Sequence, residues 1–200
     1  GRGGHASQPD QCRDPVLAAA AITLALQQIV SRRLPPQQAG VISVTAIDAP
    51  SFETIIPNAA RISGSIRISD SSVREAIWEH MREVAEATAR AYGVSCKLNT
   101  FPRYDATVNH STEAEIYRNV LATELGPKWK DEDTLLPIMA PEDFSYYLKE
   151  IPGAFALIGA NDGAVHAHPC HSPNYDFNDA LIPVVARIFS RLAHAPLPNQ

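Results

Sequence analysis

An alternating segment that runs directly into a helix pattern is the feature that most constrains the fold of this chain. Apolar and polar residues alternate from Ala60 to Ile68, which is the period of a strand with one buried face. The following residues carry an apolar stripe at helical spacing, made of Val73, Ile77, Met81 and Val84. Because side chains alternate between the two faces of a strand, its apolar side needs one continuous cover, and this stripe supplies it. The pattern predicts a sheet with helices on one face and with Arg61 and Arg67 on the other, polar and accessible face.

The rest of the first hundred residues predicts one more helix and two more strands. Asp14-Pro15 is the pattern of an N-cap and a first helical residue, ahead of an apolar helix from Val16 to Val30. Alternation marks the strands Val41 to Ile47 and Val94 to Leu98. The order helix, strand, strand, helix, strand needs one earlier strand to complete a split βαβ sandwich. We interpret Gly1 to Ser7 as the end of that strand.

Local signals predict where several helices begin and end. Ser72 to Glu75 is a capping box for the second helix, and Gly93 is a C-terminal stop. Near the end of the chain Asp179 is predicted to cap the last helix, with Pro183 in its first turn.

The second half of the chain differs from the first in its predicted secondary structure. It predicts three helices and one strand: Thr112 to Leu125, Asp143 to Lys149, Asp179 to Ala193, and the strand Ala154 to Ile158. This part is too small to form a complete α/β domain of its own. The sequence therefore predicts an α/β protein with a domain of residues 1–103 and an incomplete second domain of residues 104–200.

Charge and cysteine content exclude several functional classes. The net charge is -5 and no dense Lys/Arg block is present, which argues against nucleic acid or an anionic membrane as partner. No apolar run reaches the roughly 18 residues of a membrane span. The three cysteines, at unrelated spacings, do not form a disulfide pattern, and they favour a reducing, cytoplasmic setting.

The segment Val165 to His171 places three imidazoles and a thiol after a predicted strand and before a predicted helix. Imidazole nitrogen and thiolate suit Zn²⁺ and similar ions. The alternative is an exposed histidine-rich loop that binds nothing, since a closed site needs further ligands. Asp176 and Asp179 are the nearest carboxylates, and each suits an outer-shell or helix-capping role better than a ligand role.

Three other positions hold residue types that could take part in binding or catalysis. His5 follows a glycine-rich turn, and a site role competes there with an ordinary loop histidine. Arg67 can grip a carboxylate at two points, although a solvated surface arginine is the default. Glu142-Asp143 could assist acid/base chemistry, but a cap for the helix that follows is favoured.

Taken together, these segments resemble peptidase family M20. The resemblance covers nearly the whole chain and is closest to the branch of hippurate, N-acyl-amino-acid and indoleacetyl-amino-acid hydrolases. The segments that carry it are Gly3 to Pro9 with Asp14-Pro15, Gln27 to Arg32, Ile56-Pro57, Gly64 to Arg67, Glu142 to Leu148, Pro152 to Phe155 and His171 to Asp179.

The resemblance implies a role for four residues. His171 matches a metal ligand of the family. His5 matches the histidine that reaches across a dimer and helps stabilise the oxyanion of the tetrahedral intermediate. Arg67 matches an arginine that contacts the substrate carboxylate. Thr54 stands where the family often has Asn, so a polar substrate contact is changed at this position, and Pro141 stands where a small residue is commoner.

The implied fold is a ferredoxin-like split βαβ lid (dimerisation) domain followed by the C-terminal part of an α/β metallo-hydrolase catalytic domain. The implied activity is hydrolysis of amide bonds in N-acyl amino acids with two divalent metal ions, Zn²⁺ or Mn²⁺ with Co²⁺ as a further candidate, in a homodimer formed through the lid. Family members draw most ligands and a Glu base from upstream Cys-x-His and Glu-Glu motifs that this chain does not contain. We therefore expect an inactive fragment of an active parent. The alternative is a non-catalytic ferredoxin-like module for dimerisation or ligand binding.

Overall fold

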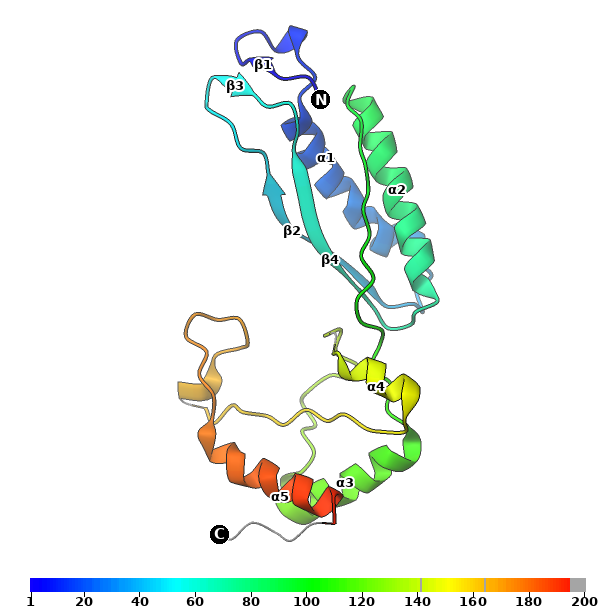
Figure 1. Ribbon diagram of the computed structural model, residues 1–200, viewed down its shortest axis with the longest axis vertical. Coiled ribbons are helices and arrows are strands. Elements are labelled where there is room, and N and C mark those ends of the chain that lie inside the picture. The colour runs from blue at the N-terminus through cyan, green and yellow to red at the C-terminus, as the bar shows by residue number, and fades with distance from the viewer. Residues whose placement is uncertain (141, 164, 195–200) are drawn as a thin grey trace. The chain divides into compact units, whose positions relative to one another are not determined.

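The computed structural model describes residues 1–140, 142–163 and 165–194. The chain forms two compact units that mix helices with small sheets (Figure 1). Unit 1 comprises Gly1–Ala106 with Pro137–Glu142, and unit 2 comprises Thr107–Leu136 with Asp143–Gln200. The assignment of residues 1–103 and 104–200 to a lid and a catalytic domain stays a prediction.

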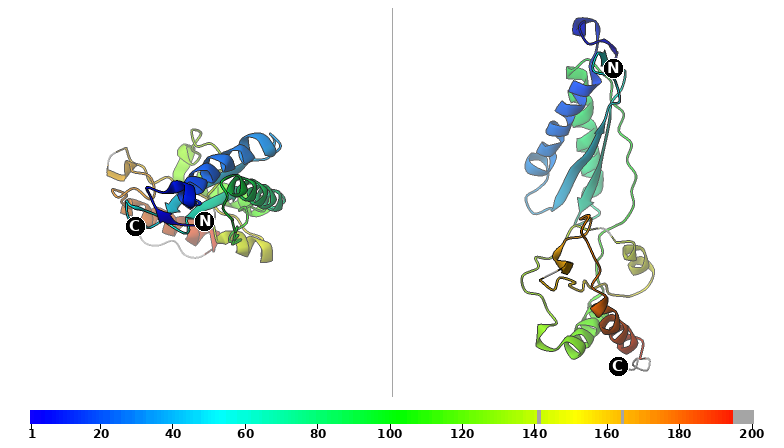
Figure 2. Two further views of the ribbon diagram at one scale, coloured as in Figure 1. Left: turned by 90° about the horizontal axis from the view of Figure 1, so that it is seen from above. Right: turned by 90° about the vertical axis from the view of Figure 1, so that its left-hand side faces the viewer.

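Unit 1 is built on an antiparallel pair of strands covered by two helices. Its main elements are α1 (Pro15–Gln28), the π-helical turn η2 (Ile29–Arg33), β2 (Gly40–Asp48), β4 (Arg61–Ile68) and α2 (Val73–Ala91). β2 pairs with β4 so that Ile42 lies opposite Ile66, with a register shift between Val44 and Ala46. Both helices lie on the same side of this sheet, as predicted (Figure 2).

The core of unit 1 is the apolar side of the sheet packed against both helices. Val73 and Ile77 of α2 are almost completely buried. Ile62, Ile66 and Ile68 of β4 pack against the same cluster. The alternation along β4 thus decides which of its faces meets the helices, because a slip of one residue would expose the isoleucines.

The ends of α1 follow local sequence signals. Asp14 Oδ1 accepts hydrogen bonds from the backbone N–H of Val16 at 2.8 Å and of Leu17 at 3.3 Å, and Pro15 is the first helical residue. The helix stops at Leu34, whose backbone is extended before the prolines that follow. The predicted N-cap is confirmed.

By length and composition alone, the 19-residue helix Pro15–Arg33 could cross a membrane, which the sequence analysis did not anticipate. A core helix of a soluble protein passes the same test. Ile22, Leu26 and Ile29 are buried in the core of unit 1, so the length and apolar content of this helix are weak support for a membrane span. The absence of a membrane partner stays an expectation.

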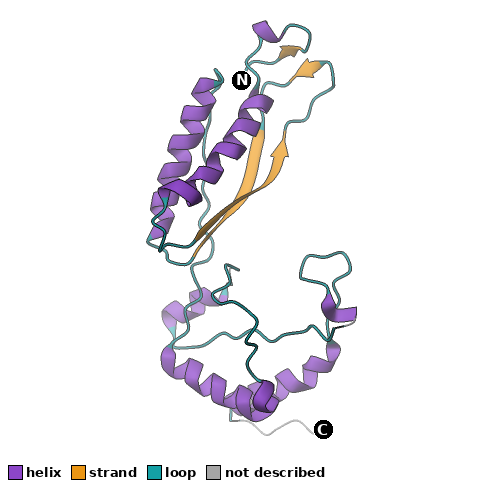
Figure 3. Ribbon diagram, turned by 180° about the vertical axis from the view of Figure 1, so that it is seen from behind, coloured by secondary structure: helices purple, strands orange, loops and turns teal. Residues whose placement is uncertain are grey.

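The predicted strand from Val94 to Leu98 is wrong. Val94 and Cys96 still pack against the core, as their alternation requires, but the segment is a loop (Figure 3). A strand needs a neighbouring backbone to pair with, and among the described residues no strand pairs with this segment. At the start of this loop Val94 N–H donates to the carbonyl of Ala89, and farther along the chain Asp105 forms an ion pair with Arg74.

The N-terminal segment also departs from its prediction. Instead of ending a strand of the main sheet, β1 (Gly4–His5) pairs antiparallel with β3 (Ile55–Ile56) in a separate sheet. A 3-10 turn, η1 (Pro9–Gln11), follows it.

Two predicted caps are replaced by their neighbours. The Ser72 side chain makes no cap bond; Asp70 Oδ1 instead accepts from Ser72 N–H at 2.8 Å, which lowers the pKa of the Asp70 carboxyl. At the end of the chain Asn178, not Asp179, caps the turn by accepting from Ala180 N–H at 3.2 Å. In each case the capping residue lies one or two positions earlier than predicted.

Unit 2 is helical in its described part. Its elements are α3 (Ser111–Leu125), the 3-10 turn η3 (Gly126–Lys128), α4 (Phe144–Glu150), the 3-10 turns η4 (Val165–Ala167) and η5 (Asp179–Leu181), and α5 (Ile182–Leu192). The predicted strand from Ala154 to Ile158 is wrong, since this segment pairs with no described strand. α3 packs against α5, and Ile188 of α5 is fully buried.

A buried carboxylate joins these two helices. Glu124 of α3 has a side chain only 6% exposed, and it accepts from Arg191 and, at 3.0 Å, from Arg187 of α5. The hydrogen bond from Arg191, followed by that from Arg187, holds the pKa of Glu124 below its ordinary value.

We expect Glu124→Gln to lower the urea midpoint of the protein at pH 7, because two guanidinium groups lose their counter-charge. Since the folded-state pKa is lowered, the carboxylate stabilises the fold above the ordinary carboxyl pKa of about 4.3 and ceases to do so as pH falls through the lowered value. The difference between variant and parent should therefore shrink in that acidic range. Glu115→Gln, which breaks only an exposed pair with Arg118, is the matched control and should change little. Equal losses in the two variants would contradict the role of Glu124.

Candidate functional site

The four predicted site residues divide between the two units. His5, Thr54 and Arg67 belong to unit 1, and His171 belongs to unit 2. The geometry within each unit decides which of them lie together and which of their polar atoms are free.

The pairing of β1 with β3 brings His5 and Thr54 to one end of unit 1. His5 lies opposite Ile55 in the ladder, and Ala6 N–H donates to the carbonyl of Thr54 at 2.9 Å. The two residues are 49 positions apart in the sequence, so only this pairing makes them neighbours.

Glycine is required for this close approach. A Cβ at Gly3 would lie 2.4 Å from the carbonyl oxygen of Ile56, and one at Gly4 would lie 2.8 Å from Cys12 Sγ. Both distances are far inside van der Waals contact. Gly3 therefore lets the chain before His5 lie directly against β3, and Gly4 leaves room for the Cys12 side chain.

The hydrogen bonds of His5 assign its tautomer. Ser7 N–H donates to Nδ1 at 3.2 Å, and Ser7 Oγ lies 2.7 Å from the same nitrogen. Because Nδ1 accepts the backbone N–H, the neutral ring carries its proton on Nε2. His5 is exposed, so it presents an Nε2–H donor to the outside, which is the group that can stabilise an oxyanion.

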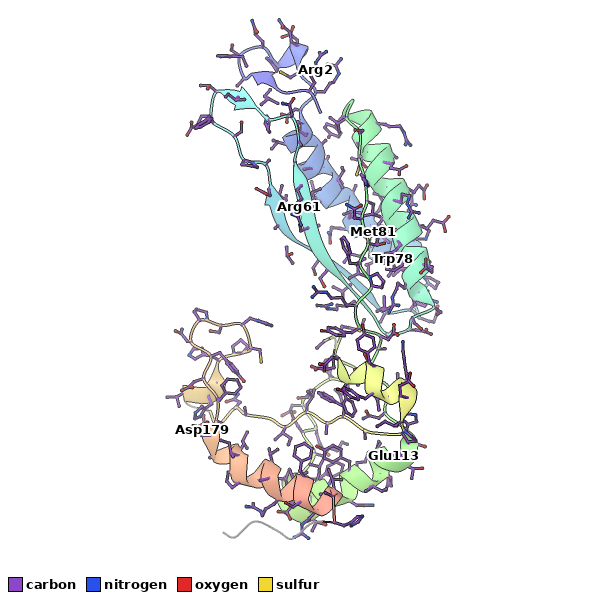
Figure 4. The ribbon with its side chains drawn as sticks, viewed as in Figure 1. Arg2, Arg61, Trp78, Met81, Glu113 and Asp179 are labelled. Carbon is purple, nitrogen blue, oxygen red and sulfur yellow. The ribbon has the colours of Figure 1, made fainter. Side chains whose placement is uncertain are left out.

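Arg67 has a guanidinium that no carboxylate of the described chain neutralises. It is half-buried in β4 opposite Val41, and its Nη1 donates a 3.5 Å hydrogen bond to the carbonyl of Ile66. No ion pair of Arg67 occurs within 4.0 Å among the described residues. Arg61, labelled in Figure 4, lies on the same face of β4 and is exposed.

Within one copy of unit 1, His5 and Arg67 do not meet. The β1–β3 pair lies at the end of the unit where β4 begins (Figure 1). Arg67 lies near the other end of β4, about 20 Å farther along at roughly 3.3 Å per residue from Arg61. The structure therefore brings His5 to Thr54 but leaves Arg67 apart from both.

His171 lies in an exposed loop with an unusual backbone. Its φ of 70° is in the left-handed region, which a residue with a side chain adopts at a cost and which clusters at functional sites. Hydrogen bonds from Ser172 N–H to the carbonyl of Pro169 and from Tyr175 N–H to that of Ser172 hold the turn, at 3.1 and 3.0 Å. Neither ring nitrogen of His171 is engaged by another residue of the described chain.

The other potential ligands of this loop do not gather around His171. His166 Nδ1 lies 2.6 Å from Asp162 Oδ2, and the Cys170 thiol is engaged with Tyr175, whose pKa is raised by burial and then by that thiol. Across the described residues no group of three or more His, Cys, Asp or Glu side chains is placed to hold a metal ion. The imidazole of His171 fits a divalent ion as one ligand, and the described chain does not complete the set.

Asp143 of the pair Glu142-Asp143 stands at the predicted start of α4. Asp143 occupies the N-cap position, but its side chain makes no cap bond. Of the aromatic residues that follow, Phe144 is half-buried and its ring lies 5.7 Å from that of Phe155, whereas Tyr146 and Tyr147 are exposed. Pro141 lies outside the described residues.

Two residues that organise unit 2 were not predicted from the sequence. Asn109 and His110 immediately precede α3 and bind the backbone of Gly153 and Phe155. An Asn before a helix ordinarily indicates an N-cap, so no local signal pointed to a partner more than 40 positions away.

Comparison with known proteins adds the family context. The sequence pattern of Peptidase family M20/M25/M40 matches residues 14–195. The chain is 33% identical to hippurate hydrolase of Campylobacter jejuni, over 96% of this chain and 49% of that protein. It is 32% identical to IAA-amino acid hydrolase ILR1-like 2 of Arabidopsis thaliana, over 96% of this chain and 44% of that protein.

A solved structure supports the same relationship. The Bacillus subtilis YXEP protein, described as a dinuclear metal binding peptidase from the M20 family, superposes with a TM-score of 0.62 at 27% identity. That match covers 90% of this chain and 45% of the YXEP chain. The chain thus spans about half the length of the relatives it matches.

Proposed function

Since the chain belongs to Peptidase family M20/M25/M40, we propose that the full-length protein hydrolyses the amide bond of N-acyl amino acids or similar small conjugates. The observation that carries this proposal is the match of almost the whole chain to hydrolases named for such conjugates. It is supported by the state of three of the four predicted site residues: the Nδ1 of His5 accepts from Ser7 and leaves Nε2–H as a donor, Arg67 forms no ion pair with a described carboxylate, and His171 has a left-handed backbone in an exposed loop.

Each residue has a proposed task that its geometry permits. His5 donates its Nε2–H to the oxyanion of the tetrahedral intermediate, with Ser7 keeping the tautomer that makes this possible. Arg67 binds the substrate carboxylate in two-point fashion. Thr54 contacts the substrate beside His5, and His171 holds one metal ion.

We propose two divalent metal ions as cofactors: Zn²⁺ or Mn²⁺, with Co²⁺ as a further candidate. The similar YXEP structure, described as a dinuclear metal binding peptidase, supports this proposal. The ions would supply a water activated at neutral pH. Because His171 is a single ligand in the described chain, the chain of 200 residues by itself is proposed to be inactive. A cytoplasmic location, with neither nucleic acid nor membrane as partner, remains part of the proposal.

A homodimer through unit 1 is proposed to complete the site. His5 and Arg67 are separated by about the length of β4 in one copy, roughly 20 Å, which no small conjugate spans. If each site takes His5 from the partner copy, both residues can serve one substrate. Two features favour unit 1 as the interface: β2 pairs only with β4 among the described strands, and Leu17 and Leu24 on α1 are more than half exposed.

The activity is tested with the full-length protein loaded with Zn²⁺, Mn²⁺ or Co²⁺ in turn. We expect release of free amino acid from a panel of N-acyl amino acids, and strong loss of both metal and activity in His171→Ala. The chain of residues 1–200 alone should release nothing and bind Zn²⁺ weakly in isothermal titration. A full-length protein that is inactive on the whole panel with every metal would refute the proposal.

The shared site is tested by mixing two inactive variants, His5→Ala and His171→Ala, under conditions that exchange subunits. In a mixed dimer one of the two sites has an intact metal ligand and receives an intact His5 from its partner. About a quarter of the parent activity should return in an equal mixture of a symmetric dimer. No recovery, despite mixed dimers seen by mass spectrometry, would place His5 in its own copy's site.

The role of Arg67 is tested with Arg67→Lys in the full-length protein. A point charge does not reproduce a planar two-point contact, so turnover of substrates with a free carboxylate should fall. An ester or amide cap on that carboxylate should remove most of the difference from the parent. Arg61→Lys, on the same face of β4, is the control and should match the parent on both substrates. Equal losses of Arg67→Lys on capped and uncapped substrates would mean that Arg67 is structural.

A further inference from the structure

Two asparagine side chains hold the backbone that leads into the His171 loop. The first is Asn109, whose Nδ2 donates to the carbonyl of Phe155 and whose Oδ1 accepts from Phe155 N–H, both at 2.8 Å. The amide thus binds one residue at two points, as a strand partner would. This pairing takes the place of the strand neighbour that the sequence predicts for Ala154 to Ile158.

The next residue strengthens the same attachment. His110 N–H donates to the carbonyl of Gly153 at 3.0 Å, and Gly153 N–H donates to His110 Nδ1 at 3.2 Å. Asn109 is not a helix cap, because His110 occupies the N-cap position of α3 and both polar atoms of Asn109 bind Phe155. The start of the segment from Gly153 to Ala160 is therefore fastened to α3.

The second asparagine closes the loop at its base. Asn178 Nδ2 donates to the carbonyl of Ala160 at 3.2 Å, while its Oδ1 caps the turn before α5 through Ala180 N–H. The loop between these two residues, Ala160 and Asn178, contains His171. The two ends of the loop are thus tied to each other, and through Phe155 and Asn109 to α3.

We propose that Asn178, supported by Asn109, is a positioning residue that holds the His171 loop in the geometry needed to bind metal. This inference rests on the proposed metal-binding role of His171. Side chains that orient a metal ligand from behind change metal affinity by about 10- to 100-fold when they are removed. His171 also has a strained backbone, which persists only where surrounding contacts determine it.

The test uses the full-length protein with Asn178→Asp, which keeps the acceptor that caps Ala180 N–H and removes the donor to Ala160. We expect the Kd for Zn²⁺, measured by competition with a chelator, to rise about tenfold. Hydrogen exchange of the backbone from Ala160 to Asn178 should become faster in the metal-free protein. Asn109→Asp, which removes only the donor to Phe155, should shift both readouts in the same direction by a smaller factor.

Asn174→Asp is the matched control. It adds the same charge in the same loop, closer to His171 in sequence, and its side chain makes no hydrogen bond with the described residues. It should leave loop exchange unchanged and should not weaken Zn²⁺ binding. If Asn174→Asp raises the Kd as much as Asn178→Asp, the effect is one of charge and the inference is overturned.

A double-mutant cycle with His171→Ala separates this inference from the proposed function. If Asn178 acts through His171, Asn178→Asp should cause no further loss of affinity in the His171→Ala background. Additive losses would overturn the inference, as would a lowered urea midpoint with unchanged metal affinity. If His171→Ala itself binds Zn²⁺ as the parent does, the proposed function fails at that residue, independently of Asn178.

Discussion

The burial of one face of β4 by α1 and α2 is the constraint on which unit 1 depends. Ile62, Ile66 and Ile68 face the helices and meet Val73 and Ile77 in one cluster. Since side chains alternate on a strand, the same packing turns Arg61 and Arg67 to the other face. The apolar core thus decides which face of β4 carries Arg67, the residue proposed to bind the substrate carboxylate.

Where backbone pairing is missing, side chains take its place. Asn109 binds Phe155 at two points, Asn178 joins the two ends of the His171 loop, and Ser7 holds the ring of His5. The bond of Ser7 orients the ring of His5, and the bonds of the two asparagines fix the backbone on either side of the His171 loop. In unit 2 these short polar contacts attach the loop that carries His171 to the ends of α3 and α5.

Periodic and local features were predictable from the sequence. The alternation before Ile68, the helical stripe after Val73 and the Asp14 cap all depend on residues within a few positions of one another. The strand expected at Val94 to Leu98 was not, although its apolar residues do reach the core. A strand depends on a partner backbone, and alternation alone carries no information about whether that partner is present.

The candidate site shows the same difference between features set by neighbouring residues and features that need a distant partner. The sequence by itself determined the residue types, the buried faces and the family to which the motifs belong, because each depends on local order. Only the tertiary structure decided that His5 lies beside Thr54 and far from Arg67, that His171 has a left-handed backbone, and that Asn109 binds Phe155. These outcomes depend on hydrogen bonds and packing between segments 40 or more residues apart or on loop closure, and a one-dimensional pattern does not encode which distant groups meet.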